Sequence, residues 1–125
     1  MNAAENKVPM PAEMQLSYFD IDNCPVAATI RVIGGKWKVI ILYLISYDIK
    51  RVGEMHSRIS GISKKTLTEQ LRELEADGII RREVFAEIPP RVEYSITEKG
   101  LTLRPIILSM SEWGMKHVIN AGGAK

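Results

Sequence analysis

The sequence predicts a mainly α-helical fold that carries one small β-hairpin. Three observations support this: apolar residues recur at helical spacing through residues 25–77, the period changes to alternation after Gly78, and a Pro-Pro pair interrupts the alternating stretch. At 125 residues, 46% hydrophobic and 26% charged, the chain suits one domain with a substantial core. We expect that domain at 23–120, after a flexible, proline-containing arm at 1–22 and before a tail at 121–125.

Composition argues against several classes of protein. The longest apolar run, residues 39–45, is too short to span a membrane, and no signal-peptide pattern opens the chain. The single cysteine, Cys24, cannot form an internal disulfide, which fits a reducing compartment. The net charge of +2 permits a polyanionic partner without establishing one. We therefore expect a cytoplasmic protein with no membrane partner, metal or cofactor.

Three helices are predicted before residue 62. Pro25 suits a first helical position, and apolar residues then recur at helical spacing until Gly34. A central helix is predicted for KWKVIILYLIS, which is apolar on almost every side, so that Trp37 should lie in the core. A third, short helix is predicted for RVGEMHSRISG, with Gly61 ending it.

The stretch at 62–80 predicts one amphipathic helix from about Lys64 to Asp77. Ser63 is a natural N-cap, and Gly78 follows as a C-terminal stop. One face carries Leu67, Leu71 and Leu74, whereas the opposite face carries Lys65, Glu69, Arg72 and Ala76, flanked by Thr66 and Thr68.

A hairpin and a closing helical region follow. The alternating runs before and after Pro89 and Pro90, reaching Glu87 on the first side, predict two strands with a proline tip. Thr97 can cap a helical region that reaches about Ile119, and Gly100 and Pro105 should kink or divide it.

Two short helices joined by a tight, glycine-containing turn, with a hairpin behind them, predict a winged helix-turn-helix. Its second helix would fit the DNA major groove, which is about 12 Å wide. The candidate DNA-binding residues have charged or hydroxyl side chains: Ser63, Lys64, Lys65, Thr66, Thr68, Glu69 and Arg72 on the helix, and Arg91 beside the hairpin tip.

Among these, Lys65, Thr68, Glu69 and Arg72 rank highest for contacts with bases. The alternative is a merely solvated helix face, because the C-terminal half of the helix is acidic. The cations lie at the end that would enter the groove, which favours DNA binding. Arg91 could enter a minor groove or simply be solvated.

The closing helix is apolar on more than one stripe, which predicts a symmetric dimer through the N- and C-terminal helices. The candidate interface residues are Val26, Ile30, Ile106, Met110 and Trp113.

Three alternative functions stay open: a module that binds protein instead of DNA, a small-molecule sensor with a pocket between the core and the terminal helices, and an enzyme. The enzyme is disfavoured because Cys24, His56 and His117 form no recognisable nucleophile or metal spacing.

Three motifs in order, CPVAATIRVIGGKWK, GISKKTLTEQLRELEADGII and PPRVEYSIT, resemble the HxlR-type winged helix family of transcription regulators. The resemblance runs from Cys24 to about Gly114, and the segment SYDIKRVGEMH departs from the family pattern. It implies a double-stranded DNA operator, transcription regulation, and dimers built by terminal helices.

The resemblance also concerns Cys24. Some members of the family sense oxidants or electrophiles through a cysteine just before the first helix, and Cys24 matches that position. A helix N-terminus stabilises a thiolate and so increases its reactivity. The alternative is an inert, packed thiol, because free cysteine is among the most buried residue types.

Overall fold

The computed structural model describes residues 23–120 and divides the chain into two units, Met1–Gly34 and Gly35–Lys125. In the first unit, helix α2 (Pro25–Ile33) has Pro25 in its first turn and Gly34 as its C-cap, as predicted. The arm predicted at 1–22 and the tail predicted at 121–125 lie outside the described residues. The assignment of domain boundaries stays a prediction.

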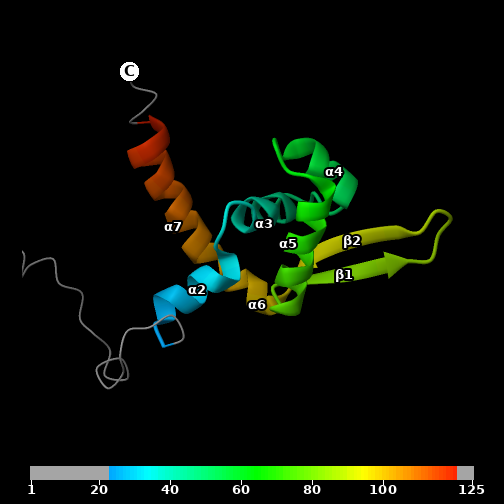
Figure 1. The fold of residues 1–125 in the computed structure, drawn as a ribbon, viewed down its shortest axis with the longest axis horizontal. Coiled ribbons are helices and arrows are strands. Elements are labelled where there is room, and N and C mark those ends of the chain that lie inside the picture. Colours follow the sequence, from blue (N-terminus) through cyan, green and yellow to red (C-terminus); the bar gives the residue numbers. More distant parts are fainter. Residues whose placement is uncertain (1–22, 121–125) are drawn as a thin grey trace, which may run out of the picture. The chain divides into compact units, whose positions relative to one another are not determined.

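The second unit is mostly helical and carries one two-stranded antiparallel hairpin, which confirms the predicted fold class (Figure 1). Its elements, in chain order, are α3 (Lys38–Ser46), α4 (Val52–Arg58), α5 (Lys64–Ala76), β1 (Ile80–Phe85), β2 (Arg91–Ile96), α6 (Glu98–Leu101), α7 (Arg104–Gly114) and a π-helical turn, η2 (Met115–Ile119).

Helix α3 differs from the prediction of a helix that is buried all round. It packs on α5 and β2 with the face that carries Ile41, Leu42 and Ile45, whereas Ile40 is 38% exposed. Trp37, expected in the core, is half-buried at the N-cap, and the Lys36 ammonium lies 4.9 Å from its ring centroid. Because α5 and β2 cover one side of α3, apolar residues on its other side remain exposed to solvent.

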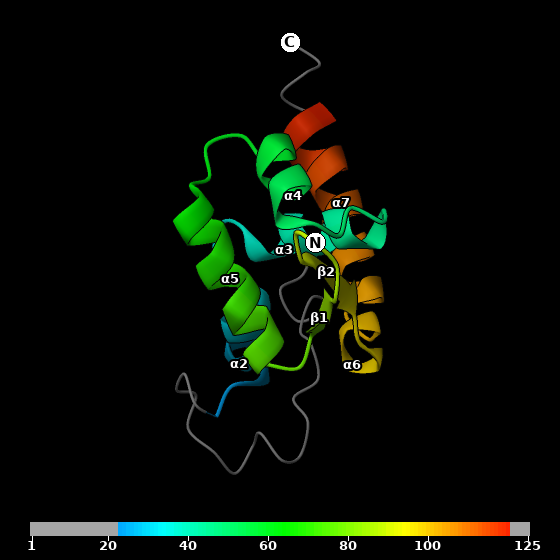
Figure 2. The same cartoon turned by 90° about the vertical axis from the view of Figure 1, so that its right-hand side faces the viewer.

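Helices α4 and α5 form the predicted helix-turn-helix and lie side by side in both views (Figure 1, Figure 2). Met55 anchors α4 at 0% exposure, and Gly61 makes the turn with a φ of 86°, a conformation that favours glycine. Before α4, the segment that departs from the family pattern turns at Asp48, whose φ is 67°. The Tyr94 N–H then donates to the Lys50 carbonyl over 2.9 Å, which attaches this segment to β2.

The hairpin extends away from the helices of its unit (Figure 1). Its register pairs Ile80 with Ile96 and Phe85 with Arg91. The first strand ends at Phe85, two residues earlier than predicted, because the Glu87 N–H donates back to the Phe85 carbonyl and begins the turn.

A set of polar contacts joins the end of α5 to α6. The Thr97 hydroxyl accepts from the Gly100 N–H at 3.0 Å, so Thr97 caps α6 as predicted. The same hydroxyl donates to the Gly78 carbonyl at 2.5 Å, and the Ile79 carbonyl oxygen lies 3.1 Å away. The Lys99 ammonium donates to the Asp77 carbonyl over 2.7 Å, at the negative end of the α5 dipole. The closing region divides after Leu101, and α7 begins with Pro105 in its first turn, as expected of proline.

Gly100 is required by a close approach of the backbone. A Cβ at this position would lie 2.2 Å from the Ile79 carbonyl oxygen, so Gly100→Ala should lower the free energy of unfolding by about 2 kcal/mol. The matched control is Gly53→Ala in α4, where a Cβ would meet nothing within 4 Å and should raise stability by about 0.5–1 kcal/mol. Urea denaturation followed by circular dichroism measures both changes, and an unchanged midpoint for Gly100→Ala would contradict the close approach.

Candidate nucleic-acid interface

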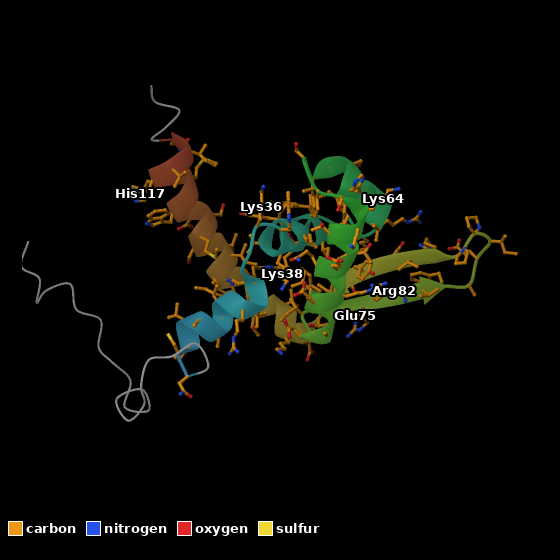
Figure 3. All side chains as sticks on the ribbon, in the orientation of Figure 1. Lys36, Lys38, Lys64, Glu75, Arg82 and His117 are labelled. Carbon is orange, nitrogen blue, oxygen red and sulfur yellow. The ribbon has the colours of Figure 1, made fainter. Side chains whose placement is uncertain are left out.

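Helix α5 presents one face to the core and the other to solvent. Leu67, Leu71 and Leu74 are each 0% exposed, as the apolar stripe predicted. Five of the residues predicted to contact DNA are exposed at or after the N-cap of this helix: Ser63, Lys64, Lys65, Glu69 and Arg72. Lys64 and Glu75, near the two ends of α5, show the change from basic to acidic character along the helix (Figure 3).

The first turn of α5 is held by the predicted N-cap. The Ser63 hydroxyl accepts from the Thr66 N–H at 3.0 Å and donates to the Thr66 hydroxyl oxygen at 3.0 Å. The Thr68 hydroxyl donates back to the Lys64 carbonyl over 2.9 Å. Because these hydroxyl hydrogens are used within the helix, Thr68 can meet a partner through its methyl group or as an acceptor.

The acidic half of α5 is partly neutralised from within the unit. Glu73 lies 3.4 Å from the Lys38 ammonium and accepts from the Gln70 side-chain amide at 3.3 Å. The Lys38 side chain is only 8% exposed, whereas that of Glu73 is 56% exposed, so the lysine stem packs in the core and its charge reaches the surface at Glu73. This pair was not predicted from the sequence, although Lys38 shares the helical face of Ile41, Leu42 and Ile45.

Arg91, predicted to reach DNA from the wing, is engaged within the hairpin. Its Nε lies 2.5 Å from Glu87 and its Nη1 lies 2.7 Å from Glu93, while the guanidinium stacks 4.0 Å from the Phe85 ring centroid. The hydrogen bond with Glu87 raises the pKa of Arg91 above its usual value. A contact between Arg91 and DNA stays a prediction, and it would require the guanidinium to leave two carboxylates.

The wing carries two exposed arginines that were not among the residues predicted to bind DNA. Arg81 and Arg82 lie on β1 opposite Ser95 and Tyr94, and Arg82 is labelled in Figure 3. Neither arginine forms an ion pair with any residue of 23–120. The signal in the sequence that could have identified them is the presence of two adjacent arginines shortly after the amphipathic helix. They add positive charge to the strand that follows α5.

Cys24 occupies the N-cap position of α2. Its backbone is extended, its side chain is half-buried, and the thiol makes no capping hydrogen bond. Val26 and Ile30 are exposed on the same helix. Within the described part of the chain, no three histidine, cysteine or acidic residues gather where they could hold a metal ion, and no helix is long and apolar enough to cross a membrane.

The three dimer candidates on α7, Ile106, Met110 and Trp113, line a shallow groove with Pro105 and Ser109. Trp113 is 63% exposed, and its ring lies 5.2 Å from that of His117. Neither α7 nor η2 contains a buried residue. The last described helices of the chain therefore present apolar side chains to solvent.

Comparison with known proteins places this arrangement in a family. The model for the HxlR-like helix-turn-helix family matches residues 32–121. YdeP of Bacillus subtilis, an uncharacterized HTH-type transcriptional regulator, is 51% identical over 98 residues, which cover 78% of this chain and 77% of YdeP. A second such regulator from the same organism, YybR, is 50% identical over 103 residues, which cover 82% of each chain.

Two solved structures agree with these sequences. The redox regulator HypR in its oxidized form is 54% identical with a TM-score of 0.70, and the match covers 75% of this chain and 97% of HypR. The reduced form of the transcriptional regulator YodB from B. subtilis is 33% identical with a TM-score of 0.65, covering 76% of this chain and 94% of YodB. The winged helix-turn-helix and the resemblance inferred from the sequence are thereby confirmed: the chain belongs to the HxlR-like helix-turn-helix family and is a DNA-binding regulator of transcription.

Proposed function

We propose that the chain binds specific duplex DNA sequences as a homodimer, with α5 in the major groove. The observation that carries the proposal is the division of α5 into a fully buried leucine face and an exposed face that bears Lys65, Glu69 and Arg72. An arginine can bind guanine in a bidentate manner, and a carboxylate can accept from cytosine. The α5 face thus holds groups that can distinguish base pairs.

The remaining candidates have positioning roles in this proposal. Ser63, Lys64 and Thr66 lie at the N-terminus of α5, where amides and cations favour phosphate. Arg82 supplies a further phosphate contact from the wing, since it is exposed and has no acidic residue opposite it. Arg91 reaches a minor groove only if phosphates or bases replace Glu87 and Glu93 as its partners.

Dimerisation is proposed from the energetics of α7. A helix of 11 residues is marginally stable alone in water, and most helices in proteins are stabilised by packing an apolar face. Because α7 and η2 bury no residue, a partner surface is needed. A second copy can supply it: Ile106, Met110 and Trp113 of each subunit would face those of its partner across a two-fold axis. Val26 and Ile30, which are exposed on α2, are proposed as further contacts with the partner.

We also propose that oxidants regulate the protein through Cys24. The redox regulator HypR is 54% identical to this chain, and the Cys24 thiol lies at a helix N-terminus without a capping hydrogen bond. Two Cys24 thiols from two subunits could lose two hydrogens to one hydrogen peroxide molecule, which gives a disulfide and two waters.

We further propose that the protein acts by binding rather than by catalysis, and that it acts in the cytoplasm, since its family consists of transcription regulators.

Base recognition can be separated from charge by two substitutions of one residue. In a selection from random duplexes, Arg72→Ala should relax the preference at one base pair and cost about 1–3 kcal/mol of binding free energy. Arg72→Lys should lose the same preference but keep the wild-type salt dependence, because the charge remains. Lys64→Ala is the control: it should weaken all duplexes alike and reduce the salt slope by about 1. Equal wild-type affinity for every duplex would refute the proposal.

The dimer depends on Trp113. Trp113→Glu should give monomers in sedimentation experiments and reduce operator affinity, because a carboxylate cannot be buried unpaired at an apolar interface. The matched control is Glu112→Lys, a charge change at the neighbouring position that should leave dimers intact. The wild-type dimer should protect two half-sites about 34–36 Å apart. A wild-type monomer at micromolar concentration would contradict the interface.

Oxidant sensing is tested on Cys24 itself. Hydrogen peroxide should change the operator affinity of the wild type, whereas Cys24→Ser should bind the same operator with an affinity that peroxide does not alter. Mass spectrometry without reductant distinguishes an intersubunit disulfide from a sulfenic acid or a mixed disulfide. An oxidant response retained in Cys24→Ser would show that the thiol is structural.

A further inference from the structure

A cavity of about 240 Å³ lies between α3, β2, α6 and α7. Leu42, Ile96, Leu101, Ile107 and Leu108 supply most of its apolar wall. An apolar cavity of about 150 Å³ is large enough to hold benzene. This cavity therefore has room for one aromatic ring with a small substituent.

The polar groups that line the cavity are hydrogen-bond donors, and its only charge is positive. Tyr43 and Tyr47 contribute parallel rings with centroids 6.1 Å apart, and Tyr47 is 72% exposed. The Ser46 hydroxyl donates to the Tyr43 carbonyl over 2.6 Å and is thereby satisfied. Arg104 belongs to the lining and has no ion-pair or hydrogen-bond partner among residues 23–120. No acidic residue belongs to the lining. The cavity thus combines an aromatic wall with an unpaired guanidinium.

Helix α7 serves the cavity and the proposed dimer with different faces. At about 100° per residue, Arg104, Ile107 and Leu108 fall on one side of the helix. Ile106, Met110 and Trp113 centre on a stripe roughly 140° away and line the separate groove. A second copy that covers this stripe would leave the cavity open to a small molecule.

We propose that this cavity binds a single-ring aromatic carboxylate. The ring packs on the tyrosine and leucine side chains, and the carboxylate forms a bidentate, charge-assisted pair with Arg104. The tyrosine hydroxyls can donate to the same oxygens. A neutral aromatic molecule would fill the apolar part but leave the guanidinium without its partner.

Occupancy has a consequence that rests on the proposed function. The ligand contacts α3 through Tyr43 and Tyr47 and contacts α7 through Arg104, so it restricts the angle between α7 and the rest of the unit. In a dimer joined by α7, that angle sets the separation of the two α5 helices. The aromatic carboxylate thereby changes operator affinity without touching DNA.

Binding is tested without DNA, so that its failure is separate from failure of the proposed function. Benzoate should bind the full-length protein saturably in isothermal titration calorimetry, with a Kd near 1 mM or tighter, and benzamide, its uncharged analogue, should bind about tenfold more weakly. Arg104→Gln should reduce benzoate affinity about tenfold and leave benzamide affinity unchanged. Tyr47→Ala should weaken the binding of both compounds, because it removes one of the two rings of the aromatic wall.

Lys116→Gln is the matched control, since it removes one cation from an exposed site outside the cavity. It should leave benzoate affinity unchanged, and circular dichroism verifies that every variant is folded. Absence of saturable benzoate binding to the wild type overturns the site. Equal losses in Arg104→Gln and Lys116→Gln also overturn it, because they would indicate non-specific attraction of an anion.

A second measurement tests the regulatory consequence. With a duplex selected by the wild-type protein, saturating benzoate should change the affinity at least threefold, and Arg104→Gln should not respond at the same concentration. Benzoate binding that leaves DNA affinity unchanged would refute the coupling while the binding site stands. Failure of the chain to select any duplex would refute the proposed function and leave the calorimetric result intact.

Discussion

The burial of one face of α5 is the constraint on which the rest of the structure depends. Leu67, Leu71 and Leu74 have no exposed surface because α3, α4 and β1 all pack against this helix. A fully buried leucine contributes about 1.5–3 kcal/mol relative to an exposed one, so rotating the helix about its axis would be costly. These apolar contacts therefore determine which way the charged face of α5 points. The charged side chains on that face do not themselves have to be ordered.

The second constraint acts on the end of the same helix. Thr97, Lys99 and Gly100 attach the start of α6 to the backbone just beyond α5 through hydrogen bonds and one close approach. Helix α7 follows α6 after a two-residue break, so the last described helices start from a point that is rigidly related to α5. The helix proposed to read DNA and the helix proposed to meet another subunit share this junction, and Gly100 at the junction also lines the cavity.

Local signals in the sequence predicted most of the elements, because caps, glycines and apolar periods act over four or five residues. Ser63 and Thr97 cap helices where predicted, and Gly78 follows α5 with a φ of 74°. Features that depend on partners distant in sequence were not predicted. The side chain of Lys38 can be buried because its ammonium pairs with Glu73, which lies 35 residues away in the sequence. The partners of Arg91 depend on the hairpin register, and the η2 turn has no apolar period to mark it.

The apolar, unburied surface of α7 and η2 has a consequence for the stability of the protein in the cell. If these helices are completed only by a second copy, folding of the C-terminal region is linked by mass action to chain concentration. The melting temperature would then rise with protein concentration. At low expression the solitary chain would spend more time with its last helices frayed, open to proteolysis. Such coupling would remove subunits that are too scarce to find a partner, giving the regulator a threshold of abundance below which it does not accumulate.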